Sequence, residues 1–123
     1  MGPLNPVEIE FVTSSALEDA GKLILATLSS SGGKIKIHTT NDIVAGFGSG
    51  IKMRLLGAAI VGVKTFPRDV VVSLKRVENH TLIKVSVRDT FGMGSRIGLT
   101  DKLQSLMWEN AISLKSAFTD VDV

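Results

Sequence analysis

The chain has 123 residues, 44% hydrophobic and 21% charged, with a formal net charge of +2, which is the composition of a single globular domain. It contains no cysteine, which excludes disulfide bonds, thiolate catalysis and cysteine-ligated zinc or iron–sulfur sites. The absence of cysteine is also compatible with the cytoplasmic location that we expect. The opening residues MGPLNPVEIE lack the basic and then apolar pattern of a signal peptide, although a leader could have been removed.

The first elements in chain order are a strand and a helix. In residues 7–11 apolar residues alternate with glutamates, which predicts a half-buried strand. A helix follows over residues 15–30, where Ser15 and Glu18 have the spacing of a capping box. The apolar residues of this segment recur at helical spacing on one face: Leu17, Ala20, Ile24 and Leu28.

The segment KIKIHTT, residues 34–40, predicts a second strand with Ile35 and Ile37 on its apolar side. Three residues are expected on the polar side of this strand: Lys34, Lys36 and His38. A turn at residues 41–42 then leads into a strand over residues 43–47.

Residues 43–63 form the most apolar segment, but they do not predict a membrane span. Lys52 and Arg54 lie near the middle, and each costs about 2.5–3.5 kcal/mol to insert into a bilayer. The glycines at 48 and 50 predict a turn between two strands. We therefore expect a hairpin and no transmembrane segment. The second strand of this hairpin is expected over residues 51–56, and residues 58–66 either continue it or form another strand.

A second hairpin and a final helix complete the pattern. Residues 69–76 and 81–89 alternate around a turn at residues 77–80, with six core positions: Val70, Val72, Leu74, Ile83, Val85 and Val87. The helix is expected over residues 100–118 with Thr100 as its N-cap, and residues 118–123 are expected to be frayed. Its apolar face is formed by Leu103, Leu106, Met107, Ala111, Leu114 and Phe118.

This order of elements predicts one α+β domain over residues 1–123. We expect a single antiparallel sheet of five to six strands in the order β-α-β-β-β-β-α, with both helices on one face of the sheet. The order is similar to that of helix-grip domains and of one half of the TATA-binding-protein fold. The likeness concerns the fold alone and implies no function.

A glycine-rich loop, GMGSRIGLTDK at residues 92–102, precedes the last helix. It does not fit the dinucleotide fingerprint, because its third glycine is Gly98 rather than residue 97 and no strand follows the helix. Gly94, Ser95 and Arg96 could still hold an anion at the start of that helix. The alternative is that the glycines only give the corner its backbone freedom.

The sequence predicts no catalytic residue, no metal site and no cofactor. His38 and His80 have no neighbour at metal-ligand spacing. Ser49 in GFGSG is expected in a hairpin turn, not in the strand-to-helix elbow of a hydrolase.

The charges predict a basic sheet face. The polar sides of the predicted strands carry Lys34, Lys36, Lys52, Arg54, Lys75, Lys84 and Arg88, with His38 among them and Glu8 and Glu10 as the opposing acids. Such a face would attract a nucleic acid, an acidic protein or an anionic membrane surface. The alternative is that the lysines serve solubility and discourage edge pairing.

Three functions remain open. The first is a non-catalytic interaction module whose basic face meets an anionic macromolecule. The second is a carrier of a small apolar ligand or lipid, in a cavity between the sheet and the C-terminal helix that would be lined by Met53, Met93, Met107 and Trp108. The third is an enzyme with a site near Arg96. A homo-oligomer is compatible with each, because three apolar residues fall on the polar side of the strands: Leu56, Val71 and Leu82.

Overall fold

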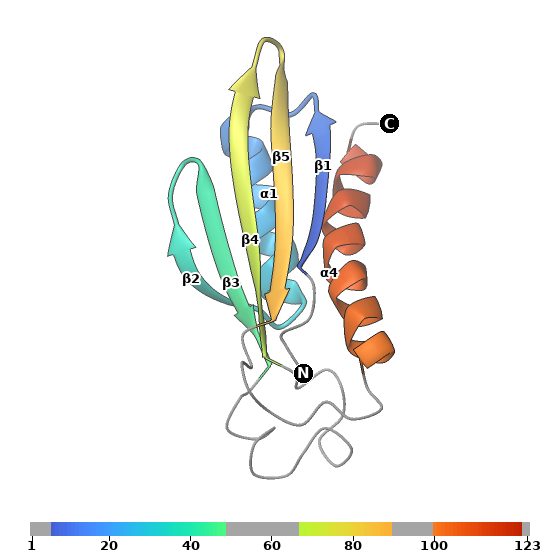
Figure 1. Cartoon of the computed structure of the whole chain (residues 1–123). Helices are drawn as coiled ribbons and strands as arrows, with labels where there is room; N and C mark the ends of the chain where they lie inside the picture. The colour runs from blue at the N-terminus through green and yellow to red at the C-terminus, as the bar shows by residue number, and fades with distance from the viewer. Residues whose placement is uncertain (1–5, 49–66, 90–99, 122–123) are drawn as a thin grey trace.

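The computed structural model describes residues 6–48, 67–89 and 100–121, which form an antiparallel five-stranded sheet and two helices (Figure 1). The strand order across the sheet is β1-β5-β4-β3-β2. The elements are β1 (Val7–Thr13), α1 (Leu17–Ser30), β2 (Lys34–His38), β3 (Asp42–Phe47), β4 (Arg68–Val77), β5 (His80–Asp89) and α4 (Thr100–Val121). The predicted α+β fold is confirmed.

Both helices cover the same face of the sheet (Figure 1). Helix α1 packs against β2, β3 and β4, and α4 packs against β1, β5 and β4. No described element covers the other side of the sheet, which we call the open face. An antiparallel sheet tolerates this arrangement, because its strands alternate between apolar residues on the covered side and more polar residues on the exposed side.

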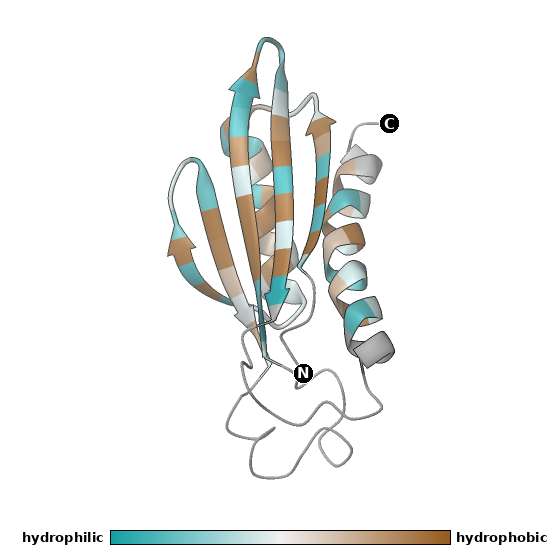
Figure 2. Cartoon of the chain, in the orientation of Figure 1, coloured by the Kyte–Doolittle hydropathy of each residue, from teal (hydrophilic) through white to brown (hydrophobic). Residues whose placement is uncertain are grey.

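The covered side holds the hydrophobic core, and the alternation along each strand is visible in Figure 2. All six core positions predicted for the second hairpin are buried, as are Ala20, Ile24 and Leu28 of α1. Helix α4 adds Leu106, Met107, Ala111, Leu114 and Phe118. The Phe118 ring packs against that of Phe11 on β1, with 5.5 Å between the ring centroids, so the end of α4 is fixed to the edge of the sheet.

Helix α1 begins differently from the prediction. The N-cap is Ala16, whose carbonyl accepts a hydrogen bond from the backbone N–H of Ala20, and no side chain caps the helix. The predicted capping box at Ser15 and Glu18 is therefore wrong. Ser15 is held from outside the helix instead, because its carbonyl accepts a 2.8 Å hydrogen bond from the Thr81 hydroxyl on β5.

Strand β2 contains an irregularity that the perfect alternation of KIKIH conceals. Its pairing with β3 shifts between Ile35 and Ile37, so that one extra residue, Lys36, is inserted there. Ile37 then lies opposite Val44 and His38 lies opposite Ile43. Because residues beyond the bulge change sides, the predicted placement of Ile37 on the core side and of His38 on the open side is wrong.

Several predicted elements fall outside the described residues. They are the strands expected within residues 49–66 and the glycine-rich loop before α4. Helix α4 extends to Val121, beyond the end predicted at Phe118.

Candidate functional site

The open face can be laid out as rows that run across the strands, because the register fixes which residues lie opposite one another. One row, near the Asp89 end of β5, joins Arg88 of β5, Asp69 of β4, Gly46 of β3 and Lys34 of β2. The next row up joins Glu8, Ser86, Val71, Val44 and Ile37.

The first row gathers positive charge, and we call Lys34, Lys36, Arg88 and Asp69 the cationic end. The Lys36 ammonium lies 2.7 Å from the Asp69 carboxylate, and Arg88 stands directly opposite Asp69 on β5. The ion pair between Lys36 and Asp69 requires a glycine at position 46, because a Cβ there would lie only 2.6 Å from Cε of Lys36. This end of the open face thus carries three cations and one carboxylate, and Lys36 forms the ion pair with that carboxylate.

The rest of the open face is more evenly charged than the sequence suggested. The register places Asp42 and Asp69 there as well as Glu8 and Glu10. The same side of the sheet carries five of the seven predicted cations: Lys34, Lys36, Lys75, Lys84 and Arg88. Lys52 and Arg54, the other two, lie outside the described residues. Of the charges that the structure describes, those away from the cationic end nearly balance.

The two additional acids carried signals in the sequence. Asp69 precedes Val70 in a strict alternation, so it had to share the polar side of β4 with Lys75. Asp42 belongs to the predicted turn at residues 41–42, but in the structure it is the first residue of β3 and lies opposite Ser73. Both acidic residues stand at or near the start of a strand and lower the net positive charge of the open face.

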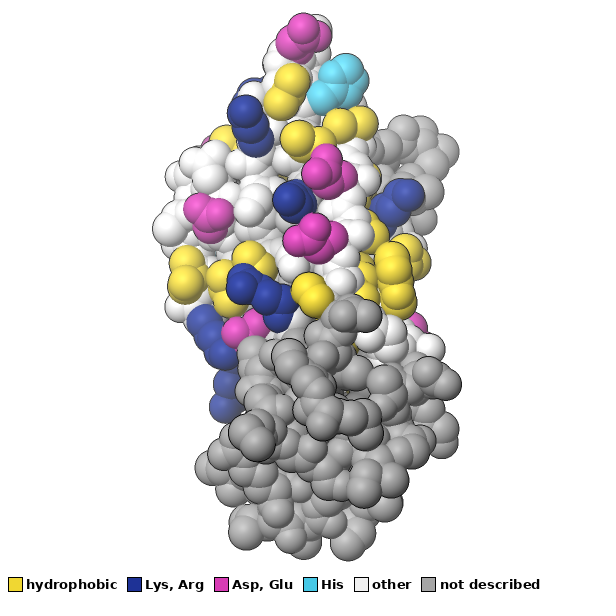
Figure 3. Space-filling view, in the orientation of Figure 1, with side chains coloured by type: hydrophobic (Ala, Val, Ile, Leu, Met, Phe, Trp, Pro, Cys, Tyr) yellow, Lys and Arg dark blue, Asp and Glu magenta, His cyan; other side chains and the backbone are white. Residues whose placement is uncertain are grey.

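An apolar row adjoins the cationic end. Ile37, Val44 and Val71 are neighbours on three adjacent strands, and Ile37 is 50% exposed because the bulge turns it outward. Val71 is half-buried on the open side, as predicted. Figure 3 shows hydrophobic and cationic side chains side by side in this region, low on the left of the view.

The opposite end of the open face has a different character. Lys84 stands opposite Glu10, and two valines, Val12 and Val77, are 58% and 44% exposed. Leu82 of β5 lies between Val12 of β1 and Lys75 of β4 in the register. This end therefore offers apolar surface without a cluster of cations.

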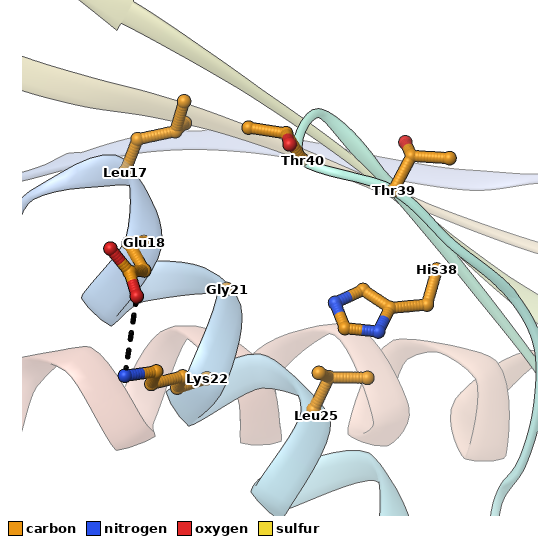
Figure 4. A pocket seen from close by; sticks show the side chains of 8 residues that line it. All are labelled: Leu17, Glu18, Gly21, Lys22, Leu25, His38, Thr39 and Thr40. Atoms are coloured by element: carbon orange, nitrogen blue, oxygen red, sulfur yellow. Dashed lines mark ion pairs between the residues drawn. The ribbon is translucent and has the colours of Figure 1, made fainter.

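A groove of about 550 Å³ lies on the other side of the sheet, between the first half of α1 and the end of β2 (Figure 4). The ring of His38 points toward Gly21 and Leu25, where the bulge has directed it. Glu18 and Lys22 line the rim and pair with each other at 3.4 Å. A single imidazole beside an ion pair that satisfies itself does not form a catalytic or metal-binding set.

A second cleft, of about 440 Å³, lies between the sheet and α4 at the end of β3. Its most unusual residue is Arg68, which is 4% exposed and lies over the Phe47 ring with 5.1 Å from Cζ to the centroid. Arg68 Nε donates a 2.5 Å hydrogen bond to Asn110 on α4. Burial lowers the pKa of Arg68 to about 10, which leaves the guanidinium charged at neutral pH.

The sequence analysis did not identify Arg68. Extending the alternation of β4 backward from Val70 places residue 68 on the covered side, and this pattern could have found it.

This cleft does not have the lining expected of an apolar carrier. Glu109 and Asn110 contribute polar groups next to Arg68. Of the residues predicted to line a cavity, Met107 is packed in the core and Trp108 is 45% exposed on the outer side of α4. Met53 and Met93 lie outside the described residues.

The remaining expectations concern catalysis, metals and membranes. Within residues 6–48, 67–89 and 100–121 no three histidine, aspartate or glutamate residues are grouped so that they could hold a metal ion. Gly94, Ser95 and Arg96 lie outside these ranges, so the predicted loop site cannot be placed. Neither described helix is both long and apolar enough to cross a membrane.

Comparison with models of known protein families gives no match, and comparison with curated protein sequences finds no significantly similar protein.

Proposed function

We propose that the protein is a non-catalytic binding module that takes an anionic macromolecule at the cationic end of its open face. The observation that supports the proposal is the excess of cations at this end of the sheet, where Lys34, Lys36 and Arg88 accompany the single carboxylate of Asp69. No described element covers this part of the open face (Figure 3).

If the cationic end binds a polyanion, the affinity should depend on the salt concentration. Exposed charges attract a polyanion over distances set by the Debye length, about 30 Å at 10 mM salt and about 8 Å at 150 mM. Binding to the cationic end should therefore weaken steeply as salt increases, with counterions released from the polyanion.

The experiment measures the affinity for heparin at several salt concentrations. In the test variant, Lys34→Glu is combined with Arg88→Glu. In water, two unit charges about 5 Å apart interact with about 0.8 kcal/mol. Each charge reversal removes one such attraction to the polyanion and adds one repulsion of the same size. Two reversals therefore exceed the roughly 1.4 kcal/mol of a tenfold change, and we expect at least tenfold weaker binding at low salt.

The matched control is Lys22→Glu combined with Lys115→Glu, which changes the net charge equally but on the two helices. If the lysines on the sheet serve only solubility, both double variants will weaken heparin binding equally, and the proposal is wrong. Arg96→Ala should have a smaller effect than the sheet variant. A larger effect would transfer the anion site to the glycine-rich loop.

A further inference from the structure

We propose that the anionic partner is an extended polypeptide segment in which acidic and apolar side chains lie two residues apart. The inference rests on the binding function proposed above and adds the chemical class of the partner. It is carried by the position of the apolar row directly beside the cationic end.

The spacing of the two rows matches an extended chain. Asp69 and Val71 are two residues apart on β4, as are Gly46 and Val44 on β3, so the rows are separated by about 6.6–6.8 Å. Residues i and i+2 of an extended peptide point to the same side at this same spacing. A peptide running along the strands can thus place a carboxylate against Lys34, Lys36 or Arg88 and the next same-side residue against the apolar row.

The exposed apolar groups give such a peptide something to bury. Ile37 is half-exposed, and Val44 and Val71 are partly so. A partner that consisted only of charges would leave this surface in water, whereas an acidic and apolar segment would cover both rows.

The distribution of carboxylates favours a narrow partner over a broad one. A flat anionic membrane or a nucleic acid duplex would meet the whole open face, including Glu8, Glu10 and Asp42, which repel it. A single extended chain covers the cationic end and the apolar row and avoids most of these acids.

Single-stranded nucleic acid is disfavoured for a separate reason. Proteins that bind single strands stack bases on aromatic side chains. The open-face positions in the described part of β1 to β5 carry no phenylalanine, tyrosine or tryptophan: Phe11 and Phe47 both lie on the covered side. His80 is on the open face, but it begins β5 at the end opposite to Arg88 and the cationic end.

The test uses three synthetic twelve-residue peptides and an NMR titration, which measures weak affinities. The first repeats Glu-Ser-Val-Ser, so that Glu and Val share one side of an extended chain. The second repeats Glu-Val-Ser-Ser, with the same composition but with Glu and Val on opposite sides. The third repeats Glu-Ser-Ser-Ser. We expect the first peptide to bind at least threefold more tightly than the other two.

Two pairs of variants locate the effect. Ile37→Thr combined with Val71→Thr should remove the preference for the first peptide, since threonine keeps the β-branched form that strands favour and replaces apolar surface with a hydroxyl group. Val12→Thr combined with Val77→Thr, at the far end of the same face, should leave the preference unchanged. Thermal melting of each variant verifies that the fold is retained.

The outcomes separate this inference from the function it rests on. If heparin does not bind, the proposed function and the inference both fail. If heparin binds but the three peptides bind equally, or the control pair removes the preference as well, the function stands and the inference is overturned. Tighter binding of oligo(dT) or of phosphatidylserine vesicles than of the first peptide also overturns it and assigns the partner to another class.

Discussion

Asp69→Asn should increase the affinity of the cationic end for a polyanion. The carboxylate lies 2.7 Å from Lys36 and opposite Arg88, so it compensates two of the cations that would meet the partner. Replacing it with an uncharged side chain of the same shape raises the net charge of the four residues by one unit. A gain in affinity is informative because misfolding would produce a loss.

The size of the gain follows from Coulomb's law. A negative group of the partner held about 7 Å from the Asp69 carboxylate is repelled by about 0.6 kcal/mol in water, which corresponds to almost threefold in affinity. Screening leaves a gain of about twofold at 10 mM salt and about 1.5-fold at 150 mM.

The same substitution should cost little stability. The Lys36 and Asp69 side chains are 53% and 22% exposed, so the pair contributes about 0.2–1 kcal/mol, as exposed ion pairs do.

Heparin titrations at the two salt concentrations test the expectation, with Asp19→Asn as the matched control. Asp19 lies in the first turn of α1 and is exposed, so this variant gains the same net charge away from the open face. An equal gain in both variants would show that net charge alone governs binding. An unchanged or weaker affinity of Asp69→Asn, with the fold intact, would refute the role of the cationic end.

Four further predictions concern the scaffold and are tested by thermal unfolding. Phe118→Ala should lower the stability by about 3–5 kcal/mol because the ring is buried, whereas Trp108→Ala on the outer side of α4 should cost less than about 1 kcal/mol. Gly33→Ala should destabilise by about 1–3 kcal/mol because its Cβ would lie 2.8 Å from the Phe47 ring. Gly21→Ala, whose Cβ meets nothing within 4 Å, should stabilise α1 by about 0.5–1 kcal/mol. Addition of EDTA should leave the melting temperature unchanged, since the zero cysteines and two histidines suggest no structural metal.

The main features of the fold could be predicted because burial imposes a period on the sequence. The alternation in β4 and β5 identified the core positions, and the helical spacing in α4 identified the face that contacts the sheet. These patterns depend only on whether each residue is buried or exposed, and the spacing of apolar residues within one segment is enough to predict that.

The features that were missed depend on contacts between distant segments. KIKIH alternates perfectly, yet the pairing with β3 inserts a bulge at Lys36, whose side chain crosses Gly46 to reach Asp69. Likewise, the capping role expected of Ser15 does not occur, and its carbonyl pairs with Thr81 of β5. No local pattern reports a partner that lies more than thirty positions away.

The local charge balance of the open face was also misjudged. The prediction set seven cations against two acids, Glu8 and Glu10, on this face. The register shows instead that Asp69 joins the cations of one row and that Glu10 stands opposite Lys84 in another. Of the predicted cations, Lys34, Lys36 and Arg88 lie at the same end of the open face, and their role in binding an anion stays a prediction.

The position of β1 at the edge beside β5 determines when the sheet can be completed during synthesis. Val7, at the start of β1, pairs with Val87, near the end of β5, so the first described strand of the sheet in chain order joins the last one. Closing a chain segment of this length is entropically costly and slow compared with forming the β4–β5 hairpin. The nascent chain must therefore carry the apolar side of β1 without its partner strand until β5 has emerged, which is the interval in which a chaperone would find it exposed.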